Sequence, residues 1–69
     1  MTKYTRMTTR NNPETGVMAN VHAGYNDGEF ATVRVTITDT DAEMVVGVKF
    51  FPVTMQGDAI AFADAAVIG

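Results

Sequence analysis

A chain of 69 residues and 7.4 kDa has room for one small domain, and residues 1–69 are expected to fold as a single unit. The absence of cysteine excludes disulfides and thiolate metal sites, and one histidine cannot form a histidine-rich zinc site. The absence of serine excludes a serine nucleophile, and the formal net charge of −3 describes a mildly acidic protein. A domain this short usually needs a further source of stability, such as oligomerisation or unusually close packing.

The charges are distributed unevenly along the chain. Residues 1–10 carry three of the five basic residues and no acid, whereas residues 11–69 carry all eight acids. An acidic chain gains little from the counterion release that drives nucleic-acid binding, so we expect a protein partner and no direct nucleic-acid contact. No apolar run approaches the roughly 18 residues of a membrane span and no signal peptide is visible. We therefore expect no membrane contact and a cytoplasmic location in a host cell.

The first half of the chain predicts two strands. Residues 2–10 are rich in threonine and predict a polar strand at a sheet edge. A turn is expected at Asn11–Gly16, which combines asparagine, proline and glycine. Apolar and polar residues then alternate over residues 17–23, the pattern of a half-buried strand. Asn26-Asp27-Gly28 is the strongest hairpin signal in the chain, because Asp-Gly readily adopts the positive φ of such turns.

Two more strands follow this hairpin. Residues 31–38 alternate strictly, with Ala31 and the valines and isoleucine after it expected to face the core. The charged segment Asp39–Glu43 interrupts the alternation and predicts a second hairpin loop. Residues 44–51 predict a fourth strand, ended by a proline that cannot continue it. Val45, Met18 and Phe51 are expected to lie on the sheet face away from the core.

The C-terminal segment has helical periodicity. From Asp58 the sequence is rich in alanine, with Thr54 or Gly57 as the expected N-cap. The residues expected to face the sheet are Ala59, Ile60, Phe62, Ala63, Ala66 and Val67. The predicted fold class is therefore α+β, a four-stranded antiparallel β-meander with one C-terminal α-helix packed on one face.

No catalytic constellation is present, so we expect no enzyme, no cofactor and no metal. His22 is predicted on the solvent-facing side of the second strand. The sequence offers no second residue to act with it in acid–base catalysis. Asp39, Asp41 and Glu43 alternate like calcium ligands, but the glycine and glutamate of an EF-hand loop are missing. Two interpretations remain open for this loop: a solvated hairpin tip, or carboxylates that take the place of phosphate on a basic protein partner.

Other candidate binding residues lie outside this loop. Asp27 and Glu29, at the preceding hairpin, are second choices for the acidic contact. Arg34 and Thr36 lie among threonines on the predicted sheet face that no helix covers, and such a face is a candidate interface. The outer side of the helix is a possible self-association surface, and a homodimer is possible. Its residues are Ala61, Ala65 and Ile68.

In its size, acidity and strand-then-helix layout ending in GDAIAFADAA (Gly57–Ala66), the chain resembles small anti-defence proteins of bacteriophages and mobile elements, such as anti-CRISPR proteins. The resemblance implies a phage or mobile-element source. It also implies a non-enzymatic protein-binding inhibitor that blocks a CRISPR-Cas-type complex by occluding its nucleic-acid or effector site.

Two other functional classes fit the same sequence. One is a small structural or assembly module that homo-oligomerises through an edge strand, with the first strand as the pairing edge, or through the helix. The other is a small-ligand sponge with a pocket formed between protomers by Tyr25, Arg34 and Lys49.

Overall fold

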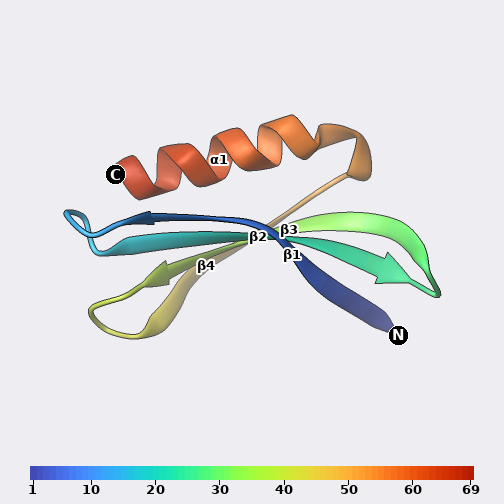
Figure 1. The fold of residues 1–69 in the computed structure, drawn as a ribbon, viewed down its shortest axis with the longest axis horizontal. Helices are drawn as coiled ribbons and strands as arrows, with labels where there is room; N and C mark the ends of the chain where they lie inside the picture. The colour runs from blue at the N-terminus through green and yellow to red at the C-terminus, as the bar shows by residue number, and fades with distance from the viewer.

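The computed structural model describes residues 1–69 and has one sheet and one long helix. The elements in chain order are β1 (Thr2–Asn12), β2 (Val17–Asn26), β3 (Glu29–Asp39), β4 (Met44–Phe51), a 3₁₀ turn (Val53–Met55) and α1 (Gln56–Ile68). The strands pair antiparallel in the order β1-β2-β3-β4, and α1 lies across one face of the sheet (Figure 1). The predicted α+β meander with a C-terminal helix is confirmed.

The turns follow from their residues. Asp27 and Gly28 both have positive φ, 50° and 86°, as a two-residue turn that matches strand twist requires. The first turn is shorter than predicted, because the two asparagines before Pro13 continue β1. At this end of the sheet, the backbone N–H and hydroxyl of Thr40 both donate to the Gly16 carbonyl, at 2.9 and 3.1 Å. The first and third turns are thereby held side by side.

The core lies between α1 and the sheet. It is built from small and branched residues: Ala19, Val21, Val33, Val35, Phe51, Ala59, Ala63 and Val67. Three of these residues are alanines, Ala19 on β2 and Ala59 and Ala63 on α1. Their small side chains allow the helix to approach the sheet closely. The helix residues at 59, 63 and 67 are buried as predicted. The largest side chains that are fully buried are valines, so the core is thin.

Irregularities in strand pairing overturn two predicted orientations. Between β2 and β3 the pairing passes from Gly24 opposite Thr32 to Tyr25 opposite Phe30, which leaves Ala31 unpaired and exposed instead of core-facing. Phe51 pairs with Val33 and is buried under α1, so its predicted position on the uncovered face is wrong.

Simple alternation along residues 44–51 predicts Met44, Val46, Val48 and Phe50 on one face and Val45, Gly47, Lys49 and Phe51 on the other, and this prediction is wrong. A bulge at Val46 shifts the pairing with β3, so that Val45, Val48 and Phe50 share the open face. Val45 and Met18 both pair with Thr38, and both therefore lie on the uncovered face as expected.

The helix begins at Gln56, directly after the 3₁₀ turn, with Met55 at the N-cap and no side-chain cap. The prediction of Thr54 or Gly57 as the cap is therefore wrong, since Thr54 lies within the 3₁₀ turn and Gly57 within the helix.

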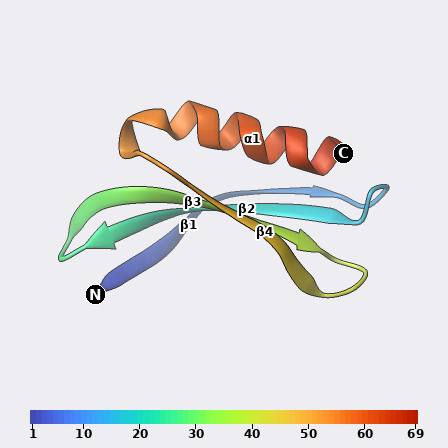
Figure 2. The same ribbon diagram turned by 180° about the vertical axis from the view of Figure 1, so that it is seen from behind.

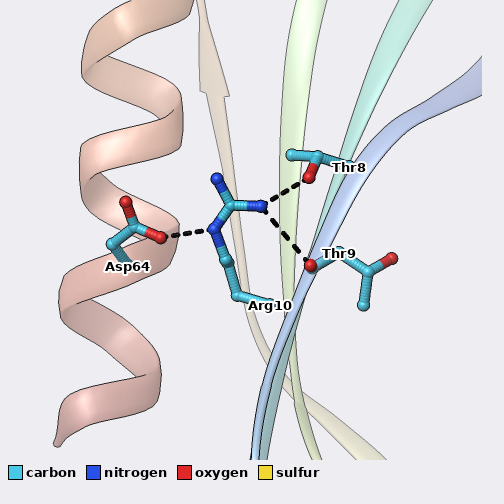
Figure 3. Close-up of polar contacts among 4 residues, drawn as sticks. All are labelled: Thr8, Thr9, Arg10 and Asp64. Carbon is cyan, nitrogen blue, oxygen red and sulfur yellow. Dashed lines mark hydrogen bonds and ion pairs between the residues drawn. The ribbon is translucent and has the colours of Figure 1, made fainter.

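Side chains from β1 and its turn hold the other half of the helix. The Asn12 amide and the Thr15 hydroxyl donate to the Val67 carbonyl, at 3.0 and 2.9 Å. Figure 3 shows Arg10 of β1 reaching Asp64 of α1, with 2.6 Å between Nε and the carboxylate. The same guanidinium also donates to the Thr8 hydroxyl. No helix of the structure has the length and apolar character needed to cross a membrane.

Candidate functional site: the open sheet face

The sheet face opposite α1 is covered by no other element, as the views from both sides show (Figures 1 and 2). We call it the open face. Strand register assigns it residues from all four strands: Thr2, Tyr4, Arg6, Thr9, Asn11, Met18, Asn20, His22, Gly24, Asn26, Glu29, Thr32, Arg34, Thr36, Thr38, Val45, Val48 and Phe50. The predicted placement of the threonines, Arg34 and His22 on this face is confirmed.

Charge is unevenly distributed between this face and the rest of the molecule. The charged side chains of the open face are Arg6 and Arg34 at its centre, with the imidazole of His22 between them, and Glu29 at its hairpin end, opposite Asn26. The other seven acids lie elsewhere, in the turns, at the end of β3 and on α1: Glu14, Asp27, Asp39, Asp41, Glu43, Asp58 and Asp64. A protein of net negative charge therefore presents one locally basic face.

An aromatic–arginine stack occupies one side of the open face. The Arg34 guanidinium carbon lies 3.9 Å from the centroid of the Tyr4 ring, a cation–π arrangement. The ring has room because residue 24 is glycine: a Cβ there would lie 2.8 Å from Tyr4 Cε1 and 2.7 Å from Thr32 Cγ2. The Arg34 Nε is buried and has no hydrogen-bond partner. The stack thus fixes this arginine over the sheet without neutralising its charge.

His22 occupies the middle of the basic cluster, directly opposite Arg6 on β1 and Arg34 on β3. Burial, and then the positive charges of Arg34 and Arg6, lower the pKa of the imidazole below its ordinary value of 6.5. Its Nδ1 is buried without a hydrogen-bond partner. The cluster is therefore arranged as two permanent cations around an imidazole that resists protonation.

The β4 side of the open face is apolar. Val48 and Phe50 face outward beside Thr36 and Arg34, and both side chains are about half exposed. Beside the basic cluster, this surface offers an apolar contact next to positive charge. Sequence reasoning assigned Arg34 and Thr36 to a partner contact but missed Tyr4, Arg6 and Phe50, whose common face depends on strand register.

The five predicted acidic residues do not form one surface. Asp27 and Glu29 belong to the hairpin at one end of the sheet, whereas Asp39, Asp41 and Glu43 belong to the hairpin at the other end (Figure 1). Arg34 and Thr36 lie between these ends, on the open face.

Within the acidic loop, local hydrogen bonds engage one of the three carboxylates, and a second lies close to the first turn. The Asp39 carboxylate accepts hydrogen bonds from the backbone N–H groups of Asp41 and Ala42, at 3.0 and 3.1 Å. The Asp41 carboxylate lies against Gly16, where a Cβ would come within 2.5 Å of it. No group of three His, Cys, Asp or Glu side chains is arranged to hold a metal ion.

The three residues of the sponge hypothesis do not share a face. Tyr25 and Lys49 lie on the helix side of the sheet, whereas Arg34 lies on the open face, so they form no pocket within a protomer. Tyr25 packs against Phe30, with ring centroids 5.5 Å apart, and the Lys49 amine lies 5.0 Å from the Phe62 ring centroid. The one pocket of the structure has a volume of about 510 Å³ and is formed instead by Met1, Lys3, Thr5, Tyr25, Asp27 and Gly28.

Comparisons of the chain with protein-family models, with curated proteins and with solved structures gave no match. The geometry of the open face is therefore the basis for a functional proposal.

Proposed function

We propose that the protein is a non-enzymatic binding domain that engages an acidic, partly apolar protein surface through its open face. The observation that carries the proposal is the distribution of charge: the centre of the uncovered face has two arginines beside exposed Val48 and Phe50, and the one acid that strand register places on this face, Glu29, lies at its hairpin end. Complementary charge steers association and fixes the docking orientation, while the apolar strip supplies area to bury.

A protein surface suits this face better than nucleic acid. Two arginines allow few phosphate contacts, and the lowered pKa of His22 opposes a third positive charge there. The exposed aliphatic side chains on β4, Val45 and Val48, offer an apolar contact that a phosphodiester backbone cannot use.

The narrower form of the proposal is an inhibitor of a bacterial defence complex of the CRISPR-Cas type, acting in the host cytoplasm. A basic open face favours occlusion of an acidic effector surface over occupation of a basic nucleic-acid groove. Occupation of such a groove would instead use Asp41 and Glu43, which lie in the exposed turn after β3.

The test uses site-specific photo-crosslinking in a bacterial host that carries an active defence complex. A photoreactive phenylalanine analogue replaces Phe50 on the open face in one variant and exposed Ala61 on the helix in another. We expect a defined crosslink from position 50 to a protein other than a second copy of this chain, and none from position 61. Plating efficiency of a targeted phage measures inhibition in the same cells.

Charge-reversal variants on the two faces of the sheet test which face contacts the partner. Arg34→Glu on the open face is expected to lower capture and inhibition at least tenfold, whereas Lys49→Glu on the opposite face of the sheet is expected to leave both unchanged. Thermal unfolding of each variant confirms that the fold is retained. Loss of capture in an Asp41→Lys/Glu43→Lys variant alone would transfer the interface to the acidic loop. The absence of any crosslink from position 50 to a protein other than a second copy of this chain would refute the proposal.

A further inference from the structure

The two edges of the sheet differ in their chemistry. The β1 edge carries Lys3 and Arg6 among threonines, which disfavours pairing with a second β1 by like-charge repulsion. The β4 edge carries exposed apolar residues and a single charge. Met44, Val45, Val46, Val48 and Phe50 are each 51–58% exposed. Soluble proteins rarely leave such an edge uncovered, because its free N–H and C=O groups are a template for another strand.

The rest of the molecule gives no cover to this edge. The helix lies over the sheet face opposite the open face, and its most extensive contacts are with β2 and β3. The fully buried core contains no side chain larger than valine. A second source of buried apolar area is therefore needed at β4, and a domain of this length commonly obtains it by oligomerisation.

We propose that two copies of the chain pair antiparallel through β4, with the twofold axis at Val48. Residues directly opposite each other must face the same side of the sheet, so the axis has to pass through a residue of β4. An axis at Lys49 would place two lysines opposite each other, which is destabilising. An axis at Val48 places Lys49 opposite Gly47 of the second copy, and Val48 opposite its own equivalent.

This pairing has a direct structural consequence. The two sheets become one eight-stranded sheet with both helices on one side and both open faces continuous on the other. The apolar strips of the two copies meet at the centre, and the basic clusters around Arg34 lie on either side. Both β4 edges are thereby paired, and only the charged β1 edges remain unpaired.

Because the chain has no cysteine, disulfide trapping tests the register cleanly. In a Val48→Cys variant the two thiols are directly opposite, with Cα atoms about 4.5–5.5 Å apart, within the range of a disulfide. In the control variant Lys49→Cys each cysteine lies one residue from the axis, so the two Cα atoms are offset by two residues along the strands and lie roughly 8 Å apart, beyond that range. We expect the Val48→Cys dimer to form at least tenfold faster under mild oxidation, and this difference to vanish in denaturant.

Sedimentation of the cysteine-free protein tests the dimer itself. We expect a mass of twice 7.4 kDa, and a monomer for Val48→Lys with an unchanged circular dichroism spectrum. A monomeric wild type at millimolar concentration, equal crosslinking at both positions, or a dimer that persists in Val48→Lys would each overturn the proposal. A wild type that is monomeric alone but captures a foreign protein through β4 would assign the edge to a partner strand and equally refute self-pairing. The Arg34→Glu test of the open face is unaffected by either result.

Discussion

His22 shows how a single residue couples charge to stability on the open face. The two arginines opposite it disfavour the protonated imidazole, and burial disfavours it further. In the unfolded chain both penalties are absent, so the unfolded state binds a proton more readily than the folded state does. Protonation of this one residue therefore lowers the stability of the fold.

The first prediction concerns the pH dependence that results. As the pH falls through 6.5, the unfolded chain takes up a proton first, so the free energy of unfolding is expected to decrease between pH 7.5 and 5.5. Since His22 is the only histidine, proton NMR of its ring gives its pKa without ambiguity. A His22→Gln variant should show a flatter stability profile over the same range. A measured pKa at or above 6.5 would contradict the electrostatic account of the cluster.

At the scale of elements, the position of α1 depends on contacts at its C-terminal half. The last carbonyls of a helix have no partner within it, and here the turn after β1 supplies donors to the carbonyl of Val67. Arg10 adds an ion pair with Asp64 that is partly exposed and therefore contributes modestly. These contacts join the first and last segments of the chain.

The second prediction tests this cap. Thr15→Val keeps the size of the side chain but removes the hydroxyl that donates to the Val67 carbonyl, and it is expected to lower the free energy of unfolding by about 1 kcal/mol. Thr15→Ser keeps the hydroxyl and should cost less. Urea unfolding of the three proteins measures the difference, and equal losses for valine and serine would show that the hydrogen bond does not contribute.

The third prediction tests the close approach of α1 to the sheet. Ala63 is fully buried, so Ala63→Leu introduces a side chain for which the core has no space and should destabilise the fold by about 1–3 kcal/mol. Ala61 is exposed on the same helix, and Ala61→Leu should change stability by less than about 0.5 kcal/mol. Comparable losses at the two positions would mean that helix packing is not limited by side-chain volume.

At the scale of the whole molecule, two unpaired surfaces have different chemistry. The open face presents positive charge beside an apolar strip, and the β4 edge presents apolar residues beside free backbone groups. The first suits an acidic protein partner and the second an identical strand. A dimer through β4 leaves the basic clusters accessible, so the two proposals are compatible in one assembly.

The fourth prediction follows from mass action. If β4 pairs with β4 of a second copy, the folded state is favoured by concentration, so the thermal midpoint should rise as the protein concentration is increased. The rise should be absent in Val48→Lys, whose folded state is monomeric. Differential scanning fluorimetry over a hundredfold range of concentration measures both proteins, and an invariant wild-type midpoint would argue against the dimer.

Much of the architecture was predictable because its signals are local. Asp27-Gly28 is a turn sequence in any context, and period-2 alternation places Val21, Val33 and Val35 on one side of their strands. The alanine-rich period of the last segment likewise identifies the helix and the face that it buries.

The site was less predictable because it depends on pairing between distant strands. Ala31 is exposed and Phe51 buried owing to the register of β3 with its two neighbours, which no single strand encodes. In the same way Tyr4, Arg6 and Arg34 meet only when β1, β2 and β3 align.

The amino-acid sequence by itself determined the number and type of elements, the turns and the identity of most core residues, since each of these depends on neighbours within a few positions. Tertiary structure alone decided which residues share the open face, where the five proposed acidic contacts lie, and which edge is apolar. The physical reason is that interactions within a single strand do not decide which of its two faces is buried or which of its two edges is paired. Only packing against other strands and the helix selects among them.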